Sequence, residues 1–138
     1  MRDQKIKNIS DFVDTHENVT ILFADIVNFT KFSSGVKPNQ VVNMLRRLFT
    51  EFDKQCYHHQ IFKMYTIGDC YVCIGFVNGN KRKLPLEEAK NVIRMGQDMI
   101  KIIGKVRMEP EVQFPELNMR IGIHTVLFIL FVSSWLTP

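Results

Sequence analysis

Residues Thr20 to Val27 read Thr-Ile-Leu-Phe-Ala-Asp-Ile-Val, an apolar run whose residue types favour a β-strand. Asp25 lies near the end of this run, where a charge is costly to bury unless a cation or hydrogen-bond donors compensate it. A second aspartate, Asp69, follows Gly68 between two further strand-like runs. If the fold brings the two carboxylates together, they form a site for a hard divalent cation such as Mg²⁺.

The apolar pattern on both sides of these aspartates predicts six elements in the order strand, helix, strand, strand, helix, strand. A tight turn at Gly68-Asp69 joins the second and third strands as a hairpin. This order is typical of an α+β fold with a ferredoxin-like βαββαβ core. The expected strands cover residues 19–27, 61–67, 70–77 and 117–124. The apolar positions expected on the two helices are Val41, Val42, Leu45, Leu48, Phe49, Phe52 and Cys56, then Ala89, Val92, Ile93, Met99, Ile100 and Ile103.

This topology predicts where the two aspartates lie. A right-handed crossover makes the first two strands parallel with a gap between them, and the third strand fills the gap in the antiparallel direction. Asp25, at the carboxyl end of the first strand, then lies at the same edge of the sheet as Asp69 at the hairpin tip. The fourth strand pairs with the other side of the first and starts from that edge, so Arg120 is expected nearby. Two carboxylates and a guanidinium in one place suit a metal-bound phosphate.

Each of these residues also has a simpler interpretation. Asp25 could cap a loop and Asp69 could be an ordinary turn aspartate, but their expected proximity favours metal ligation. Arg120 could form a structural ion pair or clamp a triphosphate, and the sequence leaves both open. Residues 25–30 pass from a strand into a turn or helix. Their backbone N–H groups could bind an anion, or the segment could be an ordinary connection between strand and helix.

The composition limits the classes of partner. Hydrophobic residues at 46% and charged residues at 23% are typical of a globular domain, and the net charge of +4 is too small to favour nucleic acid. Three cysteines do not form a disulfide framework and favour a reducing, cytoplasmic location. Cys70 and Cys73 point to opposite faces of a strand, which disfavours zinc. The apolar run 126–136 is too short to cross a bilayer, so membrane attachment is expected only through regions outside this chain.

Three segments together resemble the catalytic domain of the class III adenylyl and guanylyl cyclases. They are Val-Thr-Ile-Leu-Phe-Ala-Asp-Ile-Val-Asn-Phe-Thr (19–30), Tyr-Thr-Ile-Gly-Asp-Cys-Tyr (65–71) and Leu-Asn-Met-Arg-Ile-Gly-Ile-His-Thr (117–125). The first two in tandem are far more specific than a lone glycine motif. The resemblance implies a ferredoxin-like core that pairs with a second cyclase half, with active sites at the interface. It also implies conversion of ATP or GTP to the 3′,5′-cyclic monophosphate and pyrophosphate.

The resemblance also implies a role for individual residues. Asp25 and Asp69 correspond to the catalytic ligands of two Mg²⁺ or Mn²⁺ ions, and the carbonyl of Ile26 assists them. The nucleotide-binding residues implied by the resemblance are Ile26, Val27, Asn28, Phe29 and Thr30 of the phosphate loop, together with Gly68 and Arg120.

One position departs from the family pattern in a way that concerns the purine. Tyr65 stands where the family often carries a lysine for adenine or a glutamate for guanine, so the sequence leaves the choice between ATP and GTP open. A tyrosine there fits a heterodimer in which the partner half reads the base, and it resembles protist guanylyl cyclases.

The boundaries expected from this resemblance are a linker or the end of a preceding helix at 1–18, a partial cyclase domain at 19–125, and an unmatched apolar tail at 126–138. After Thr125 the family's base-reading and transition-state residues do not follow, so little activity is expected of this polypeptide alone. It is expected in the cytoplasm, by itself or in a membrane-bound parent. The alternatives are a degenerate cyclase-like half that dimerises and regulates, or another phosphate-binding ferredoxin-like domain such as a cyclic dinucleotide synthase.

Overall fold

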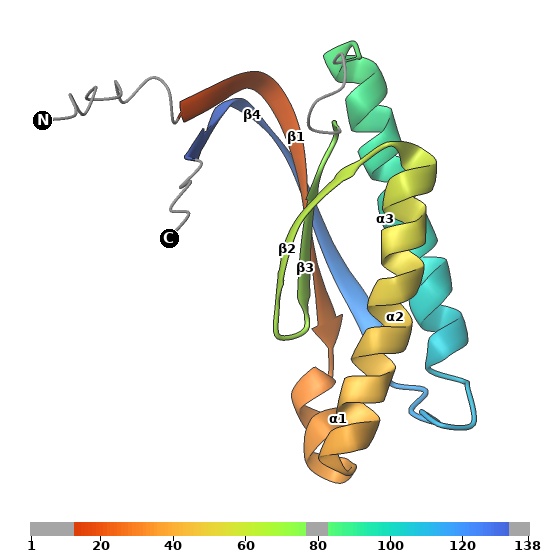
Figure 1. Cartoon of the computed structure of the whole chain (residues 1–138). Coiled ribbons are helices and arrows are strands. Elements are labelled where there is room, and N and C mark those ends of the chain that lie inside the picture. Colours follow the sequence, from red (N-terminus) through yellow and green to blue (C-terminus); the bar gives the residue numbers. More distant parts are fainter. Residues whose placement is uncertain (1–12, 77–82, 133–138) are drawn as a thin grey trace, which may run out of the picture.

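The computed structural model describes residues 13–76 and 83–132, which form a four-stranded sheet with helices on one face (Figure 1). The predicted α+β class and the ferredoxin-like order are confirmed, and a short helix is added after the first strand. The elements are β1 (Val13–Val27), α1 (Phe29–Gly35), α2 (Pro38–His59), β2 (Phe62–Ile67), β3 (Cys70–Ile74), α3 (Pro85–Val106) and β4 (Asn118–Val132).

The strands lie in the order β2-β3-β1-β4, and each neighbouring pair is antiparallel. The third strand therefore fills the gap between the first two, as the crossover argument predicted. Because of this order, the tip of the β2–β3 hairpin, the carboxyl end of β1 and the start of β4 all lie at one edge of the sheet (Figure 1).

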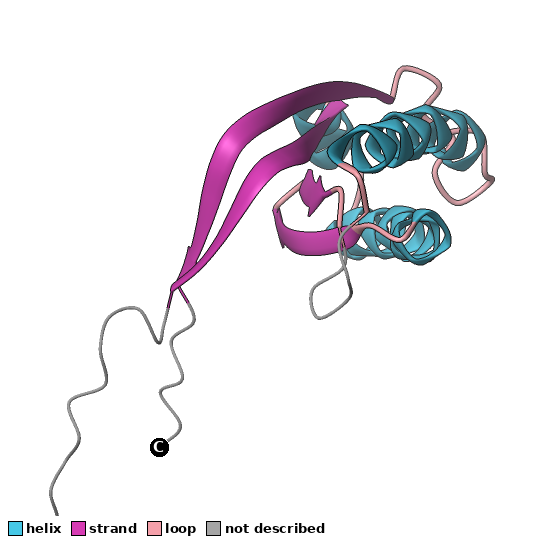
Figure 2. Ribbon diagram, turned by 90° about the horizontal axis from the view of Figure 1, so that it is seen from above, coloured by secondary structure: helices cyan, strands magenta, loops and turns pink. Residues whose placement is uncertain are grey.

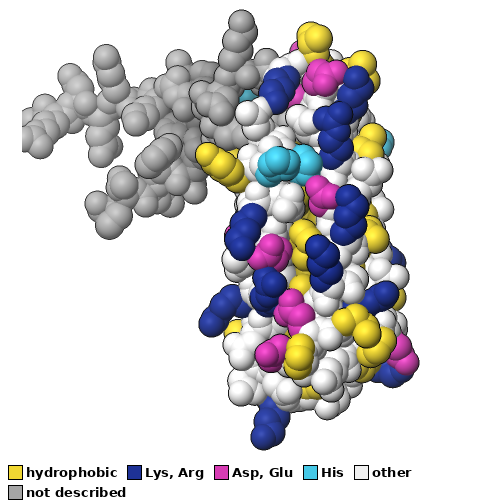
Figure 3. Space-filling model, turned by 90° about the vertical axis from the view of Figure 1, so that its right-hand side faces the viewer, with side chains coloured by type: hydrophobic (Ala, Val, Ile, Leu, Met, Phe, Trp, Pro, Cys, Tyr) yellow, Lys and Arg dark blue, Asp and Glu magenta, His cyan; other side chains and the backbone are white. Residues whose placement is uncertain are grey.

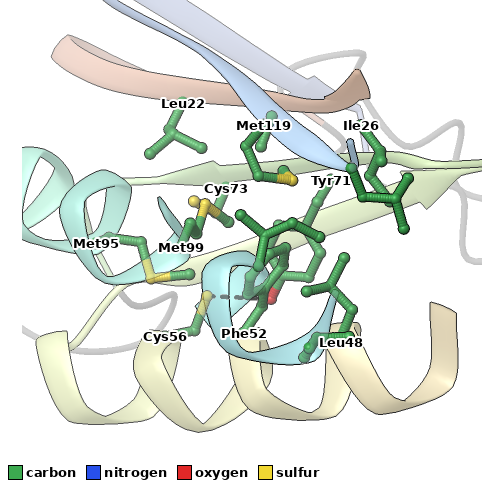
Figure 4. Close-up of a cluster of buried hydrophobic side chains, with 14 of the residues drawn as sticks. Leu22, Ile26, Leu48, Phe52, Cys56, Tyr71, Cys73, Met95, Met99 and Met119 are labelled. Carbon is green, nitrogen blue, oxygen red and sulfur yellow. Dashed lines mark hydrogen bonds between the residues drawn. The ribbon is translucent and has the colours of Figure 1, made fainter. Parts of the chain in front are cut away.

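Helices α2 and α3 cover one face of the sheet and enclose the larger core (Figure 2). Helix α2 turns a buried side chain toward the sheet at every fourth position, which is the spacing of one helical face. The buried side chains of α2 and α3 meet those of β1, β3 and β4 (Figure 4). Those labelled in the figure are Leu22, Ile26, Leu48, Phe52, Cys56, Tyr71, Cys73, Met95, Met99 and Met119.

Three apolar helix positions expected on the buried stripes are instead about half-exposed. Val42, Ile93 and Ile100 have exposed fractions of 52%, 50% and 44%, whereas Met44 and Met95 are buried. A 3.6-residue period predicts that a stripe exists, but neighbouring elements decide how far around the helix it is covered. Residues at the border of a stripe are therefore the ones that the pattern places least well.

Strands β1 and β4 form a ribbon that reaches past the helical layer (Figure 2). They pair from Val27↔Asn118 to Val13↔Val132, so residues 13–18 and 126–132 extend the two strands beyond the expected ranges 19–27 and 117–124. The prediction missed them because each strand takes its hydrogen bonds from the other, whatever its own hydrophobic pattern. Residues 1–12 and 133–138 of the predicted flanks lie outside the described residues.

The outer surface of the helices carries charged side chains of both signs, interspersed rather than segregated (Figure 3). Several form ion pairs along or between helices, such as Arg47–Glu51 and Lys101–Asp98. Among the helices described, none is long and apolar enough to cross a membrane.

Candidate functional site

Asp25 is accommodated because it lies on the helix-free face of the sheet. Along β1, Leu22, Ala24 and Ile26 are buried against the helices, while Phe23 is 47% exposed. The two-residue period of a strand places Asp25 on the same side as Phe23, and its side chain is 38% exposed. The carboxylate near the end of an apolar run therefore avoids the core and faces solvent at the edge of the sheet.

The hairpin that carries Asp69 is a two-residue turn. Ile67 pairs with Cys70, so Gly68 and Asp69 are the central residues. Gly68 has a φ of +58°, a conformation that side chains of L-residues rarely adopt. The glycine thus lets the strand reverse tightly enough to present Asp69 at the tip, as the sequence predicted.

The structure places Asp69 beside Asp25 at one edge of the sheet. The pKa of Asp69 is raised above its usual range, mainly by partial burial and then by the charge of Asp25 and a hydrogen bond with it. The backbone N–H groups of Asp69 itself and of Ile26 donate to this carboxylate and oppose the rise. Two acids that share one place repel each other, and a divalent cation relieves that repulsion.

Arg120 lies directly opposite Asp25 in the β1–β4 ladder. Its Nε and Nη2 atoms donate to Oδ2 of Asp25 at 3.2 Å and 2.5 Å. Both groups are exposed, with 75% of the Arg120 side chain accessible, and such pairs contribute only about 0–1 kcal/mol. The guanidinium is therefore placed at the two acids but held weakly enough to turn to another anion.

The donor set suits Mg²⁺ or Mn²⁺ better than zinc. Within the described residues no group of three or more His, Cys, Asp or Glu side chains could hold a metal ion. Mg²⁺ does not need such a group, because it is usually bound through one or two carboxylates, with waters and substrate phosphates as the other ligands. Asp25, Asp69 and the nearby Ile26 backbone supply that kind of partial set.

The two cysteines of the Cys70-Tyr-Val-Cys73 segment lie on opposite faces of β3, as expected. Cys73 is buried in the core under the helices. Cys70 lies beside the acids, since burial and then the charges of Asp25 and Asp69 raise the pKa of its thiol. The sequence analysis did not include Cys70 in the site, although the strand alternation contained that information.

Residues 26–30 lead from β1 into the short helix α1. Ile26 and Val27 end the strand, and Asn28 takes a left-handed conformation with a φ of 64°. Phe29 and Thr30 open the helix, whose first N–H groups have no acceptor within it. The side chain of Asn28 donates to the carbonyl oxygen of Glu116 at 3.0 Å, which ties this turn to the segment before β4.

Apolar side chains surround the two acids on the helix-free face. Tyr65 and Phe23 both lie opposite Val72 in their ladders, so the three form one row across the sheet. Tyr65 is 45% exposed, and Ile67 beside the hairpin turn is 69% exposed. Exposed apolar side chains next to a polar site are typical of a surface that a partner covers.

Comparison with known proteins gives a consistent result. Residues 12–133 match the family described as the adenylate and guanylate cyclase catalytic domain, a match that extends past the expected 19–125 at both ends. Guanylate cyclase alpha of Plasmodium falciparum is 39% identical over 112 residues, which is 80% of this chain and 3% of that protein. Adenylate cyclase type 9 of Xenopus laevis is 39% identical over 109 residues, 79% of this chain and 8% of that protein.

A solved structure agrees with the sequence matches. The guanylyl cyclase domain of the RhoGC fusion protein from the aquatic fungus Blastocladiella emersonii superposes with a TM-score of 0.75 and 25% identity. The alignment covers 92% of this chain and 67% of that domain. The chain therefore spans a small part of its curated relatives and about two thirds of one cyclase domain.

Proposed function

The chain belongs to the adenylate and guanylate cyclase catalytic domain family, and we propose that it supplies the metal-binding part of a cyclase active site. The reaction is the conversion of GTP or ATP to the 3′,5′-cyclic monophosphate with release of pyrophosphate. The observation that carries the proposal is the position of Asp69 beside Asp25 at one edge of the sheet, with Arg120 paired to Asp25. A relative named for guanylate and one named for adenylate are each 39% identical to the chain, so the choice of purine stays open.

In this proposal Asp25 and Asp69, assisted by the Ile26 carbonyl, hold two Mg²⁺ or Mn²⁺ ions. When bound, such ions would activate the ribose 3′-hydroxyl and neutralise charge on the triphosphate. The proximity of Asp25 and Asp69 favours cation binding over two free negative charges, and ions held by the two acids would in turn bind the phosphates.

The neighbouring backbone and Arg120 bind the nucleotide's phosphates. N–H groups of residues 26–30, where β1 turns into α1, face the anion together with the turn at Gly68. Arg120 leaves Oδ2 of Asp25 and donates to phosphate oxygens, because its planar fork suits a phosphate and its exposed ion pair is weak.

A second cyclase half completes the site. The exposed apolar side chains on the helix-free face, Phe23, Tyr65 and Ile67, belong to the surface that this partner covers. The partner reads the purine, because Tyr65 is unsuited to select between the two bases. The chain alone has little activity in this proposal, and it acts in the cytoplasm, by itself or within a membrane-bound parent.

A regulatory half without catalysis is the competing function. Its supporting observation is that the chain covers only about two thirds of a cyclase domain. A half that only dimerises has no use for two adjacent acids, however, because their repulsion destabilises the fold. The acids therefore favour the catalytic role.

The test supplies this chain's metal site to a partner that lacks one. The partner is the catalytic domain of a guanylate cyclase relative in which the two corresponding aspartates are asparagine, so that it is inactive alone. Adding the chain should restore Mn²⁺-dependent cyclic nucleotide production. Asp25→Asn or Asp69→Asn in the chain should lower the rate about 100-fold or more.

Two controls make the result decisive. Asp53→Asn changes an acid on α2 that lies on the helix side of the sheet, and it should leave the restored rate unchanged. Calorimetric titration of Mn²⁺ into the chain alone should show binding that either site variant removes. Restored turnover that is insensitive to both site variants would exclude Asp25 and Asp69 from the reaction.

A further inference from the structure

The connection between α3 and β4 contacts the turn that follows β1. Nδ2 of Asn28 donates to the backbone oxygen of Glu116 at 3.0 Å, and Lys31 forms an ion pair with the Glu116 carboxylate. The rings of Phe32 and Phe114 pack edge to face, with their centroids 5.5 Å apart. These five residues, which we call the clasp, join two segments that lie far apart in the sequence.

The backbone of Asn28 explains why an asparagine stands in this turn. Its φ is 64°, in the left-handed region that glycine, asparagine and aspartate occupy more readily than other residues. An asparagine before a helix usually caps it by accepting from an N–H group of the first turn, but Asn28 makes no such hydrogen bond with α1. Its amide instead donates across to Glu116. The side chain therefore fixes the turn to the connection before β4 rather than to its own helix.

The clasp is anchored in the core from both segments. Phe32 has an exposed fraction of 1%, and Leu117, which follows Glu116, is fully buried at 0%. The Lys31–Glu116 ion pair, by contrast, is exposed, and exposed pairs contribute little to stability. The Asn28 hydrogen bond and the aromatic contact are therefore the interactions that hold the two segments together.

The clasp extends the β1–β4 ladder beyond the ends of the two strands. Val27 pairs with Asn118 at the end of the ladder, and the contact of Asn28 with Glu116 follows directly. Arg120 lies two residues further along β4. The turn after β1 and Arg120 are the two groups that the proposed function assigns to the triphosphate, so the clasp fixes one of them relative to the other.

We propose that Asn28 is a positioning residue for triphosphate binding, and that the clasp holds the phosphate-binding turn, residues 26–30, in register with Arg120. This role rests on the proposed function, in which the turn and Arg120 bind the same triphosphate. A turn that is already aligned loses less conformational entropy when the anion binds, so the affinity is higher than for a turn that must first be ordered. Because its amide is directed at Glu116, Asn28 acts through the backbone of the turn and not by donating its side chain to a phosphate.

The experiment measures GTP turnover by the chain together with the inactive guanylate cyclase partner described above, and Mn²⁺ binding by the chain alone. Asn28→Gly keeps the left-handed backbone but removes the hydrogen bond to Glu116. It should raise the KM for MnGTP about three- to tenfold, the range expected for one hydrogen bond, while kcat changes less than about twofold. Mn²⁺ affinity should stay near that of wild type, because Asp25 and Asp69 are unchanged.

A second variant and a matched control accompany Asn28→Gly. Phe114→Ala opens the clasp at a residue outside the phosphate-binding turn, and it should raise the KM at least about twofold, as expected for loss of an aromatic pair. Asn18→Gly makes the same substitution at another left-handed residue, with a φ of 51°, which lies nearer the other end of β1. It should leave the KM unchanged. Denaturant unfolding shows whether each variant is folded under the assay conditions.

The split between KM and kcat separates positioning from simple stabilisation. A clasp that only stabilises the fold would lower the amount of active chain, so kcat would fall in Asn28→Gly at an unchanged KM. An unchanged KM would therefore overturn the proposal, and so would a KM that rises equally in Asn18→Gly. If Asn28→Gly does not fold, the KM of Phe114→Ala decides. Absence of turnover with the wild-type chain would instead contradict the proposed function, and the role of Asn28 with it.

Discussion

Single residues explain why the site forms where it does. Strand alternation directs Asp25 away from the core, and the left-handed backbone of Gly68 presents Asp69 at a hairpin tip. Cross-strand register then brings Arg120 opposite Asp25. The placement of the three residues at one edge followed from the sequence, because strand order and direction determine which ends of the strands share an edge. The face of the sheet on which Asp25 lies was not part of that prediction.

The pairing of Arg120 with Asp25 could not be predicted, because the sequence left an ion pair and a phosphate clamp equally open. The structure shows the ion pair, with both nitrogen donors on one carboxylate oxygen. The position of Cys70 beside the acids was not predicted either, because it depends on which residues of β1 and the hairpin turn lie next to β3.

A substitution at Arg120 should separate its two roles. Arg120→Ala removes a cation that competes for Asp25, so Mn²⁺ should bind the nucleotide-free chain up to about fivefold more tightly, as expected for an exposed ion pair of up to about 1 kcal/mol. Triphosphate binding should weaken in the same variant. Calorimetric titration of Mn²⁺ and of MnGTP measures both affinities.

Arg120→Lys is the control for charge. It keeps the cation but loses the planar fork, so Mn²⁺ affinity should stay near that of wild type while triphosphate affinity still falls. Weaker Mn²⁺ binding in Arg120→Ala would contradict the competition between the guanidinium and the metal.

Contacts between elements determine how closely the helices approach the sheet. Gly75 follows β3, and a Cβ placed there would lie 3.1 Å from Cβ and 3.2 Å from the backbone oxygen of Glu88 on α3. Gly75→Ala should therefore destabilise the fold by about 1–3 kcal/mol, as overpacking does. Denaturant unfolding of the two proteins measures the difference.

Gly104→Ala is the matched control on α3. Among the described residues no heavy atom lies within 4 Å of the added Cβ, and alanine favours a helix over glycine by roughly 0.5–1 kcal/mol. This variant should be more stable than wild type. If both substitutions shift stability in the same direction, the close approach of Gly75 to Glu88 does not determine the effect of Gly75→Ala.

One polar contact joins the two long helices. Asp98 on α3 accepts from Nε2 of His59 on α2 at 2.8 Å and from Nζ of Lys101 at 2.8 Å. The pKa of Asp98 is lowered, mainly by Lys101 and then by His59. A carboxyl whose folded pKa lies below its unfolded value stabilises the fold above the unfolded pKa, and this contribution is lost as pH falls through the folded pKa.

Asp98→Asn should therefore lower the free energy of unfolding by about 0.5–1.5 kcal/mol near pH 7. This difference should shrink below about pH 4, where the unfolded aspartate is protonated. Urea unfolding at several pH values follows the difference. Glu111→Gln, an exposed carboxyl outside the helices, should change stability by less than about 0.5 kcal/mol. If Asp98→Asn lowered the free energy of unfolding by the same amount at every pH, the charge of Asp98 would not contribute to stability.

The limits of the sequence prediction are clearest at the scale of whole helices and strands. Helix and strand types were correct because their apolar periods differ, whereas Val42 and Ile93 were assigned to buried stripes that do not reach them. The ends of β1 and β4 were missed because the two strands pair with each other beyond the helical layer, where neither needs a hydrophobic pattern.

At the scale of the whole molecule, the sheet has one face under helices and one without. The exposed apolar side chains on the helix-free face adjoin the two acids, which supports a partner surface at the proposed active site. A site shared between two chains lets each half supply different groups, so an open face is expected beside an incomplete set of ligands.

Ile67, which is 69% exposed beside the hairpin turn, offers a test of this surface. Ile67→Asp should weaken binding to a complete cyclase domain at least about tenfold, since desolvating a charge at an interface is costly, without changing the chain's own unfolding. Sedimentation equilibrium measures the association.

Leu86→Asp is the control, because Leu86 is similarly exposed, at 65%, but lies on α3 in the helical layer. It should bind the partner as wild type does. Equal effects of the two substitutions would remove the helix-free face as the interface.

The β1–β4 ribbon has a mechanical consequence. Val13 pairs with Val132, so both strands leave the ribbon at the same end, far from the Asp25–Arg120 pair near the other end. Tension that draws those two ends apart would unzip the ladder one rung at a time instead of shearing all its rungs together. A weak force would therefore break only the outermost strand pairs. The acids would stay in register until almost all of the remaining pairs had opened.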